Sequence, residues 1–550
     1  MLITGIPLTG GRSYSADMTV QTEPGTTPNR PPSITDERVA QLLDRITAEE
    51  NGQPAKTVTT YAPYTATPIA DIPQSSTEDV TTAFGLARAA QREWAKRPVA
   101  DRARVVLKFH DLLLGRQDEA MDLIQWETGK ARKHAFAEVM SPMVVARHYG
   151  RRARGILRTR RALGMFPGLT SVWALRRPKG VVGIISPWNY PFELGSADAI
   201  PALLAGNGVV SKPDTQTVLS VLWAQELMEE AGLPQRLWQI VAGDGPVIGP
   251  AVVGHADYVS FTGSTRTGRD VAQRAAANLT GVSLELGGKN PMIVLPDADL
   301  ARTVAGAIDA CFSSAGQLCI STERLYVHER LYDAFTQRFA EAAGTMRLAA
   351  TYDFAADMGS LTTKAQLEKV SEHVEDAKAK GATVLAGGSP RPDVGPYFFE
   401  PTVLAIVPQH ATVCTEETFG PVVAVYKYRD VNEVIERANN TPYGLNASVW
   451  TRDSRNGRRI AARLDAGTVN VNDGYAATYG SIGAPMGGMK NSGLGRRHGR
   501  EGLLRFTEPQ TIAVERLVIG VEPPLRRMSY DRWRRLLSRG LLTLKRIGVR

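Results

Sequence analysis

Cys319 ends the run Ala315-Gly-Gln-Leu-Cys, which follows an apolar segment that begins near Leu300. A thiol on a Gly-containing turn after a helix can face a cleft, where backbone N–H groups can point at an incoming oxygen. Cys319 is therefore a candidate nucleophile. The alternative is a cysteine buried in the core, which free cysteines more often are. The cysteine alone does not decide between the two.

A second chemical group is Glu285, which lies 34 residues before Cys319. It belongs to the run Val-Ser-Leu-Glu-Leu-Gly-Gly-Lys-Asn-Pro at 282–291, which reads as a short strand broken by paired glycines. A carboxylate inside an apolar strand is unfavourable unless it has a partner or a chemical role. Glu285 is therefore a second residue with a candidate chemical role.

Four further motifs accompany these two runs: Pro-Trp-Asn-Tyr-Pro at 187–191, Phe-Thr-Gly-Ser-Thr at 261–265, Glu-Thr-Phe-Gly-Pro at 417–421 and Pro-Met-Gly-Gly at 485–488. Together the six motifs, in their order along the chain, resemble the aldehyde dehydrogenase superfamily over about residues 60–515. Within it the chain is most similar to the NADP-type succinate-semialdehyde dehydrogenases.

The resemblance implies oxidation of an aldehyde to its acid through a cysteine thiohemiacetal and a thioester. In this scheme the Cys319 thiolate attacks the carbonyl carbon. The Asn189 side chain and the Cys319 backbone N–H stabilise the oxyanion. Glu285 activates the water that hydrolyses the thioester. Without the resemblance, Asn189 would read as a turn residue before Pro191.

The resemblance also implies a nicotinamide cofactor, NADP with NAD as an alternative. The cofactor-binding residues that it indicates are Ser186, Trp188, Lys212, Thr215, Gly263, Ser264, Gly268, Leu286, Glu417 and Phe419. No residue is assigned to a metal site.

The cofactor preference depends on the segment after a predicted strand. Lys212 is expected to face the adenosine ribose, and Thr215 aligns where many NAD-preferring relatives have a Glu. A neutral residue beside a cation favours NADP, although Asp214 adjoins the site, and Lys212 could be a solvated loop charge. At 263–268 the glycines lack the usual G-x-G-x-x-G spacing, so a simple strand-to-helix turn is the alternative there.

Succinate semialdehyde is the expected substrate. Well-characterised enzymes of that type hold the distal carboxylate with arginines, but Ser313 and Ala197 align at those positions. Less polar medium-chain or aromatic aldehydes are therefore an alternative. A catalytically idle structural or binding member of the fold is disfavoured because Cys319, Glu285 and Asn189 are intact. An acylating reductase that uses CoA or phosphate is disfavoured by the presence of Glu285.

The elements that must position these residues form an α/β fold. From Val181 onward, short apolar runs alternate with helical stretches, which predicts βαβ units on a parallel sheet. In such a Rossmann-like sheet, ligands bind beyond the carboxyl ends of the strands. A second α/β unit begins after Pro291. The segments through Arg154 read as packing helices without a part in the chemistry.

We divide the chain into a disordered leader (1–33), a cofactor-binding domain (34–159 and 179–286), a catalytic domain (287–490), a β arm for oligomerisation (160–178 and 505–520) and a basic amphipathic tail (524–550). The expected assembly is a homo-oligomer, a dimer or a tetramer.

The net charge of +9 is concentrated in the tail, where nine basic residues and one acid lie between Arg526 and Arg550. The rest of the chain is nearly neutral and gives no reason to expect a nucleic-acid partner. The tail could contact a membrane surface peripherally, or it could dock on the protein's own body or on a neighbouring subunit. Only three cysteines occur, which favours a reducing compartment, and the cytoplasm is expected.

Overall fold

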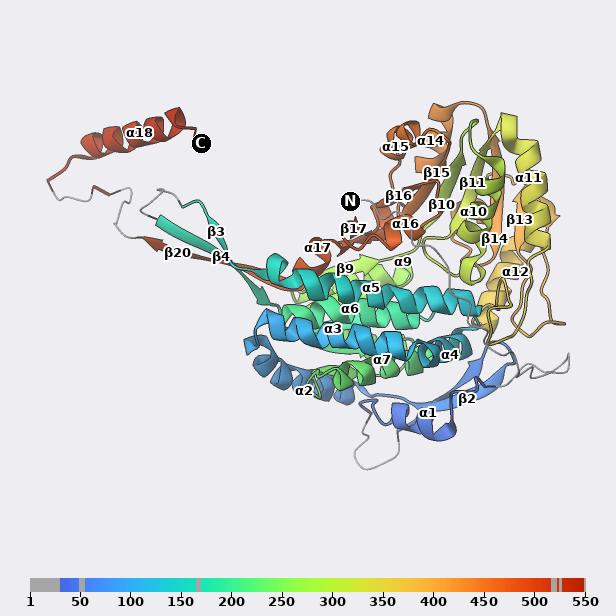
Figure 1. The fold of residues 1–550 in the computed structure, drawn as a ribbon, viewed down its shortest axis with the longest axis horizontal. Helices are drawn as coiled ribbons and strands as arrows, with labels where there is room; N and C mark the ends of the chain where they lie inside the picture. The colour runs from blue at the N-terminus through green and yellow to red at the C-terminus, as the bar shows by residue number, and fades with distance from the viewer. Residues whose placement is uncertain (1–29, 49–54, 165–169, 516–521, 524–526, 549–550) are drawn as a thin grey trace, which may run out of the picture.

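The computed structural model describes residues 30–48, 55–164, 170–515, 522–523 and 527–548 (Figure 1). Most of the predicted leader therefore lies outside the described residues. Where the leader enters the described part, the Ser33 hydroxyl donates a hydrogen bond to the Asp122 carboxylate. The first elements are α1 (Asp36–Leu43), capped by the Thr35 side chain, and the hairpin of β1 (Thr57–Ala62) and β2 (Thr67–Pro73).

The first of two large sheets has the strand order β18-β9-β8-β5-β6-β7. Its strands are β5 (Val181–Ile185), β6 (Gly208–Lys212), β7 (Trp238–Ile240), β8 (Tyr258–Thr262), β9 (Gly281–Glu285) and β18 (Gly493–Leu494). All neighbours are parallel except β18, which pairs antiparallel with β9. The sequence analysis assigned residues 491–504, which include β18, to no domain.

Helices cover both faces of this sheet (Figure 1). Val181 packs with the helices of one face and Val182 with those of the other, because successive side chains of a strand point in opposite directions. One face is covered by α2 (Thr77–Lys96), α8 (Gly245–His255) and α9 (Thr265–Ala277). The other is covered by α6 (Pro191–Ala205) and α7 (Val218–Glu230), with α3 (Val99–Gly115), α4 (Gln117–Thr128) and α5 (Arg132–Leu157) packed outside them.

The second sheet has the order β12-β13-β14-β11-β10-β15-β16, parallel except for β12. Its strands are β10 (Asn290–Val294), β11 (Thr322–His328), β12 (Thr383–Ala386), β13 (Thr402–Ala405), β14 (Val422–Tyr428), β15 (Asn446–Trp450) and β16 (Thr468–Val471). The helices of this unit are α10 (Leu300–Phe312), α11 (Glu329–Gly344), α12 (Lys364–Ala379), α13 (Thr412–Thr415), α14 (Val431–Asn439) and α15 (Ser454–Ala461). The predicted pair of α/β units is confirmed.

The segment 474–485 contains the one-turn helix α16 (Ala476–Tyr479). One oxygen of Asp473 accepts hydrogen bonds from the backbone N–H groups of Tyr475 and Ala477, which supports this turn. Four residues are too few to show a helical period in the sequence. Short elements follow it: β17 (Pro485–Met486), β19 (Arg497–His498) and α17 (Glu501–Leu504).

The predicted arm strands pair with one another. β4 (Thr170–Pro178) lies antiparallel between β3 (Arg160–Ala162) and β20 (Thr507–Glu515), and this small sheet extends away from the body (Figure 1). Beyond it lies α18 (Tyr530–Arg546), which confirms the predicted tail helix. None of the helices in the described ranges is long and apolar enough to cross a membrane.

A buried ionic network connects the first sheet to the segment that follows the second. Asp198 on α6 accepts two hydrogen bonds from Arg497, at 3.0 and 2.8 Å, and a further one from Arg505. Ser260 on β8 also donates to Asp198, and Arg497 donates to Thr262. Burial raises the pKa of Asp198, but the two arginine charges outweigh it, so the net pKa lies below its usual value.

We expect Asp198→Asn to destabilise the protein by about 3–5 kcal/mol, because two buried guanidinium groups lose their anionic partner. The urea midpoint followed by tryptophan fluorescence measures this change. The matched control is Asp270→Asn, which breaks the exposed pair with Arg274 and should cost less than about 1 kcal/mol. Equal midpoints for the two variants would contradict the importance of the buried network.

Candidate active site

The Cys319 loop begins with three consecutive left-handed residues after α10. Ser314, Ala315 and Gly316 have φ values of 51°, 54° and 69°. Such a conformation costs about 1–3 kcal/mol for a residue other than glycine. Contacts offset this cost, because the Ser314 N–H donates to His134 Nδ1 at 3.2 Å and the Ser314 hydroxyl bonds to the Tyr190 hydroxyl at 2.7 Å. The loop is therefore held in one shape.

Glycines in three motifs allow main chains to approach one another. A Cβ on Gly316 would lie 2.0 Å from the carbonyl oxygen of Gly420, and one on Gly288 would lie 2.6 Å from that of Cys319. A Cβ on Gly287 would meet the Glu417 carboxylate at 2.5 Å. Any larger residue would push these segments apart. The motifs that lie far apart in the sequence therefore meet at the cysteine.

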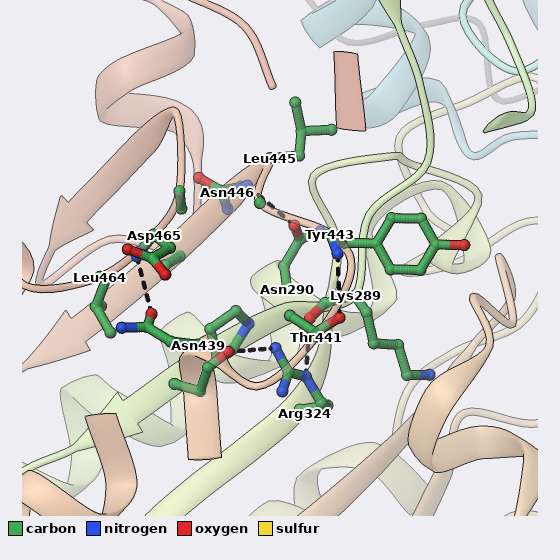
Figure 2. Close-up of a pocket in the computed structure, with 15 residues that line it drawn as sticks. Lys289, Asn290, Arg324, Asn439, Thr441, Tyr443, Leu445, Asn446, Leu464 and Asp465 are labelled. Carbon is green, nitrogen blue, oxygen red and sulfur yellow. Dashed lines mark hydrogen bonds between the residues drawn. The ribbon is translucent and has the colours of Figure 1, made fainter. Parts of the chain in front are cut away.

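Asn290, the first residue of β10, fixes the backbone of the nucleophile. Its Nδ2 donates to the carbonyl oxygens of Cys319 at 2.8 Å and Ser321 at 2.7 Å, while its Oδ1 accepts from the Asn446 N–H. Figure 2 shows Asn290 pointing toward Asn446, with Arg324 beside them. Among the described residues, the Cys319 backbone N–H has no acceptor. This donor is therefore free for an incoming oxygen.

Glu285 ends β9 and is buried. Its Oε1 has no hydrogen-bond partner among the described residues and lies 2.9 Å from where a Cβ on Gly487 would be. Burial raises the pKa of Glu285 to about 7, against the opposing charges of Arg497 and Arg505. A carboxylate with this pKa can take up and release a proton near neutral pH.

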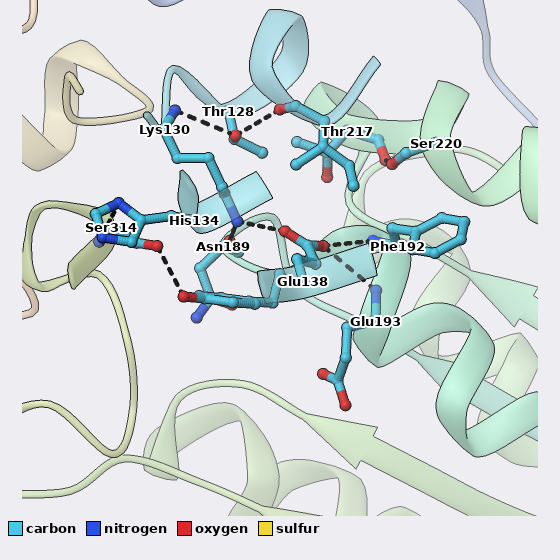
Figure 3. Close-up of polar contacts among 12 residues, drawn as sticks. Thr128, Lys130, His134, Glu138, Asn189, Phe192, Glu193, Thr217, Ser220 and Ser314 are labelled. Atoms are coloured by element: carbon cyan, nitrogen blue, oxygen red, sulfur yellow. Dashed lines mark hydrogen bonds and ion pairs between the residues drawn. The ribbon is translucent and has the colours of Figure 1, made fainter. Parts of the chain in front are cut away.

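Asn189 lies in the loop between β5 and α6, and a buried ion pair holds it in place (Figure 3). Lys130 donates to the Asn189 carbonyl oxygen at 2.6 Å and pairs with Glu138. Glu138 in turn accepts hydrogen bonds from the Phe192 and Glu193 N–H groups at the start of α6. The Asn189 Nδ2 donates to the Gln317 carbonyl oxygen at 2.9 Å, two residues before Cys319, which leaves its second N–H available.

This support was not predicted from the sequence, in which the segments through Arg154 read as packing helices without a part in the chemistry. That reading is wrong for Lys130, His134 and Glu138, which position Asn189 and Ser314. The only feature of the sequence that could have indicated this support is a lysine and a glutamate eight residues apart in segments predicted to be packing helices. Such residues also occur on solvated helix faces, so the sequence alone could not place them inside.

The predicted cofactor residues of the first sheet gather at one edge. Ser186, Lys212, Gly263 and Leu286 stand at the carboxyl ends of β5, β6, β8 and β9, which are parallel. The Ser186 Oγ is buried without a hydrogen-bond partner among the described residues, as expected for a group that meets a ligand. The carboxyl ends of parallel strands are where dinucleotides bind in sheets of this type.

The start of α9 adds a site for an anion. Ser264 caps this helix by accepting from the Thr267 N–H at 3.2 Å, and both residues are exposed. A helix N-terminus favours negative charge such as a pyrophosphate. Gly268 lies one turn inside, and a Cβ there would come within 2.4 Å of Leu286. The glycine therefore lets α9 pack closely on the end of β9.

Lys212 and Thr215 form the part predicted to face the adenosine ribose. Lys212 is buried, and its ammonium has no hydrogen-bond partner within the described part of the chain. Burial lowers the pKa of Lys212, which Asp214 and Asp244 partly offset. One oxygen of Asp214 accepts from the Gln216 N–H and caps the short helix η1 (Thr215–Thr217). Thr215 is half-buried and neutral.

Glu417 and Phe419 come from the second unit, just before β14. The Glu417 carboxylate accepts from the Gly288 N–H at 2.9 Å, and burial raises its pKa to about 7, with a smaller contribution from Glu323. Phe419 packs edge-on against Trp188, with ring centroids 5.6 Å apart. Glu323, paired with the buried Lys289, accepts from the Phe419 N–H. The two units therefore meet between Trp188 and Phe419.

Apolar and aromatic side chains surround Cys319. Tyr190, Leu194, Leu318, Ile320, Leu445 and Met486 form one cluster, against which Cys319, Tyr475 and Tyr479 pack. Burial raises the pKa of the Cys319 thiol to about 12, with further contributions from the Glu417 and Glu285 carboxylates. The thiol is therefore protonated at neutral pH and must lose its proton before it can attack.

Glu193 is a buried carboxyl close to this cluster. Burial raises its pKa to about 7, and its charge contributes to the raised pKa of Cys319. Its Oε1 accepts from Ser141 at 3.3 Å, while its Oε2 has no partner at hydrogen-bond distance among the described residues.

The two positions that align with substrate-binding arginines of the resembling enzymes carry no guanidinium group. Position 197 is an alanine, and Ser313 donates a hydrogen bond to the Asp309 carbonyl oxygen.

Comparisons with known proteins agree with this geometry. The aldehyde dehydrogenase family model matches residues 50–512. A relative from Mycolicibacterium smegmatis, named a candidate NADP(+) succinate-semialdehyde dehydrogenase, is 54% identical over 462 residues, which cover 84% of this chain and 89% of the relative.

Solved structures show the same fold. The NAD+ complex of an aldehyde dehydrogenase from Bacillus cereus has a TM-score of 0.81 and 36% identity, covering 88% of this chain and 99% of that one. An NADP-dependent enzyme from E. coli has a TM-score of 0.82 and 30% identity, covering 86% and 99%. With the family model spanning most of its length and motifs from both α/β units meeting at Cys319, this chain belongs to the aldehyde dehydrogenase family.

Proposed function

We propose that this protein oxidises an aldehyde to its carboxylic acid, with Cys319 as nucleophile, Glu285 as base and Asn189 as oxyanion donor. The observation that carries the proposal is the convergence of these three residues. Gly288 lies against the carbonyl oxygen of Cys319, and Glu285 lies three residues before Gly288 in the same segment. The Asn189 side chain donates a hydrogen bond to the carbonyl oxygen of Gln317, which lies two residues before Cys319.

The residues divide the work as follows. Water takes the proton of the Cys319 thiol, and the sulfur bonds to the aldehyde carbon, while the oxygen takes hydrogen bonds from Asn189 and the Cys319 N–H. The bound nicotinamide cofactor supplies the hydride acceptor. Glu285 then takes a proton from water, whose oxygen attacks the thioester and releases the acid. Its unpartnered Oε1 and a pKa of about 7 support this role.

NADP is the cofactor that we propose, with NAD as an alternative. Lys212 offers an ammonium without a hydrogen-bond partner in the described part, and Thr215 adds no negative charge beside it. The Mycolicibacterium relative is named for NADP(+), whereas the Bacillus enzyme was solved with NAD+. Ser186, Gly263, Ser264, Gly268 and Leu286 would hold the dinucleotide. Trp188, Glu417 and Phe419 would hold its nicotinamide half.

Succinate semialdehyde is the proposed substrate, in agreement with the name of the Mycolicibacterium relative. Without arginines at 197 and 313, the distal carboxylate would need other donors. Tyr475 and Tyr479 bring hydroxyl groups to the wall, and Glu193 in its protonated form offers an O–H. The apolar cluster around Cys319 also favours a second candidate, the oxidation of less polar medium-chain or aromatic aldehydes.

The assembly that we propose is a homo-oligomer formed through the sheet of β3, β4 and β20. Strand β20 is exposed over nearly its whole length, which suits pairing with another copy. The small number of cysteines supports a reducing compartment, the cytoplasm.

The first prediction tests the catalytic residues. Cys319→Ala should abolish aldehyde oxidation and leave cofactor binding, measured by fluorescence, intact. Glu285→Gln should give one burst of reduced cofactor and then turn over at least ~10²-fold more slowly, because the thioester accumulates. Cys414→Ala, at a cysteine whose sulfur contacts Pro408 and Tyr426, is the control and should keep its activity. Normal steady-state turnover in either active-site variant would refute the assignment.

The second prediction concerns Thr215. A carboxylate introduced by Thr215→Glu would face the 2′-phosphate, and a unit-charge pair at 4 Å interacts by about 4 kcal/mol at an effective dielectric of 20, before screening. The kcat/KM for NADP should therefore fall more than that for NAD. Thr215→Gln has nearly the same size without the charge and should leave the ratio nearly unchanged. An unchanged ratio in the Glu variant would exclude this position from the ribose site.

The third prediction uses the pKa of Glu193, about 7. Below this pH the carboxyl is neutral and can donate to a distal carboxylate, whereas above it the anion repels one. The kcat/KM for succinate semialdehyde, divided by that for butanal, should therefore fall as pH rises through about 7. Division by the neutral aldehyde removes the titration of Glu285. Glu193→Gln should flatten this ratio, and a ratio that titrates equally in the variant would rule Glu193 out.

A further inference from the structure

The tail helix α18 presents two chemically distinct faces. Around its axis, Trp533, Leu536, Leu537, Leu541, Leu544 and Ile547 share one side, at steps of three and four residues. The basic residues Arg532, Arg534, Arg535, Arg539, Lys545 and Arg546 lie on the remaining circumference. Ser529 caps the first turn by accepting from the Arg532 N–H. The helix is therefore strongly amphipathic and basic.

Within the described ranges, three of the six apolar residues on this side of α18 are exposed, whereas Trp533 is buried and Leu537 and Leu544 are half-buried. The helix lies beyond the arm and apart from both large sheets (Figure 1). Leu536, Leu541 and Ile547 are 47%, 57% and 67% exposed. Among the described residues, the apolar side of α18 is therefore not docked as a whole on the two large sheets, although Trp533 is itself buried.

Most of the basic side chains of α18 have no acidic partner among the described residues. Its one acid, Asp531, pairs with Arg534 and Arg535. Among the described residues, no acid pairs with Arg532, Arg539, Lys545 or Arg546. Residues 526–550 carry eight of the nine net positive charges, so the rest of the chain is close to neutral. A second copy therefore brings no excess of negative charge to this helix.

We propose that α18 binds the surface of an anionic phospholipid bilayer, lying in the plane of the headgroups. The exposed leucines and Ile547 would enter the acyl boundary, and the arginines and Lys545 on the flanks would meet the lipid phosphates. A helix of 17 residues with this many charges lies on a membrane and does not span it. The arm would hold the catalytic body away from that surface.

The test is flotation of the full-length protein with vesicles of phosphatidylglycerol and phosphatidylcholine, against vesicles of phosphatidylcholine alone. Arg539→Gln with Arg546→Gln should lower the partition coefficient about fivefold per cation. Leu536→Gln with Leu541→Gln should also lower it, and high salt should weaken binding of the unmodified protein. The matched control is Arg92→Gln with Arg151→Gln, two exposed arginines outside the tail.

All variants should keep normal aldehyde oxidation, because none of the changed residues belongs to the active site. Flotation that depends on anionic lipid, salt and both faces of α18 would support the proposal. Absence of flotation of the unmodified protein would overturn it, and so would equal flotation of the tail and control variants. Loss of oligomers in the tail variants without any lipid binding would assign α18 to a contact between copies instead.

Discussion

The active site depends on the close approach of main chains that only glycine permits. Gly316 lies against Gly420, and Gly288 lies against the Cys319 carbonyl, at distances that leave no room for a Cβ. These contacts bring the loop after α10, the end of β9 and the segment before β14 into one place. The chemistry of Cys319 therefore rests on backbone packing before any side chain acts.

A second constraint is the concentration of buried acid around one thiol. Glu285, Glu417 and Glu193 each have a pKa raised to about 7 by burial, and their charges help to raise the pKa of Cys319. Each of the three carboxylates acts on the thiol, because a negative charge near Cys319 disfavours the thiolate. The thiolate that the chemistry needs is therefore the form that its own surroundings disfavour.

Much of this arrangement could be predicted from the sequence because its signals are local. The alternation of apolar runs and helical stretches from Val181 onward appears in the structure as parallel βαβ units, and the second unit begins after Pro291 as expected. Motif resemblance then placed Cys319, Glu285 and Asn189 without any knowledge of their contacts. Their roles remain predictions, whereas the fold and the family are established.

What the sequence could not reveal depends on long-range packing. Lys130 and Glu138 read as ordinary helix residues, yet they hold the Asn189 loop and the start of α6. Asp198 and Arg497, almost 300 residues apart, gave no sign that they form a buried pair. Whether a charged residue is buried and paired depends on a partner that lies far away in the sequence, and the local hydrophobic pattern gives no information about that partner.

The antiparallel pairing of β18 with β9 has a consequence for synthesis of the chain. β9 is made early, but its outer edge is covered only when residues 493–494 leave the ribosome, after the whole second sheet. Until then a nascent chain carries an apolar strand with open hydrogen-bonding groups, next to the future catalytic base. During the interval between the two strands, this open edge can pair with other chains or be bound by chaperones.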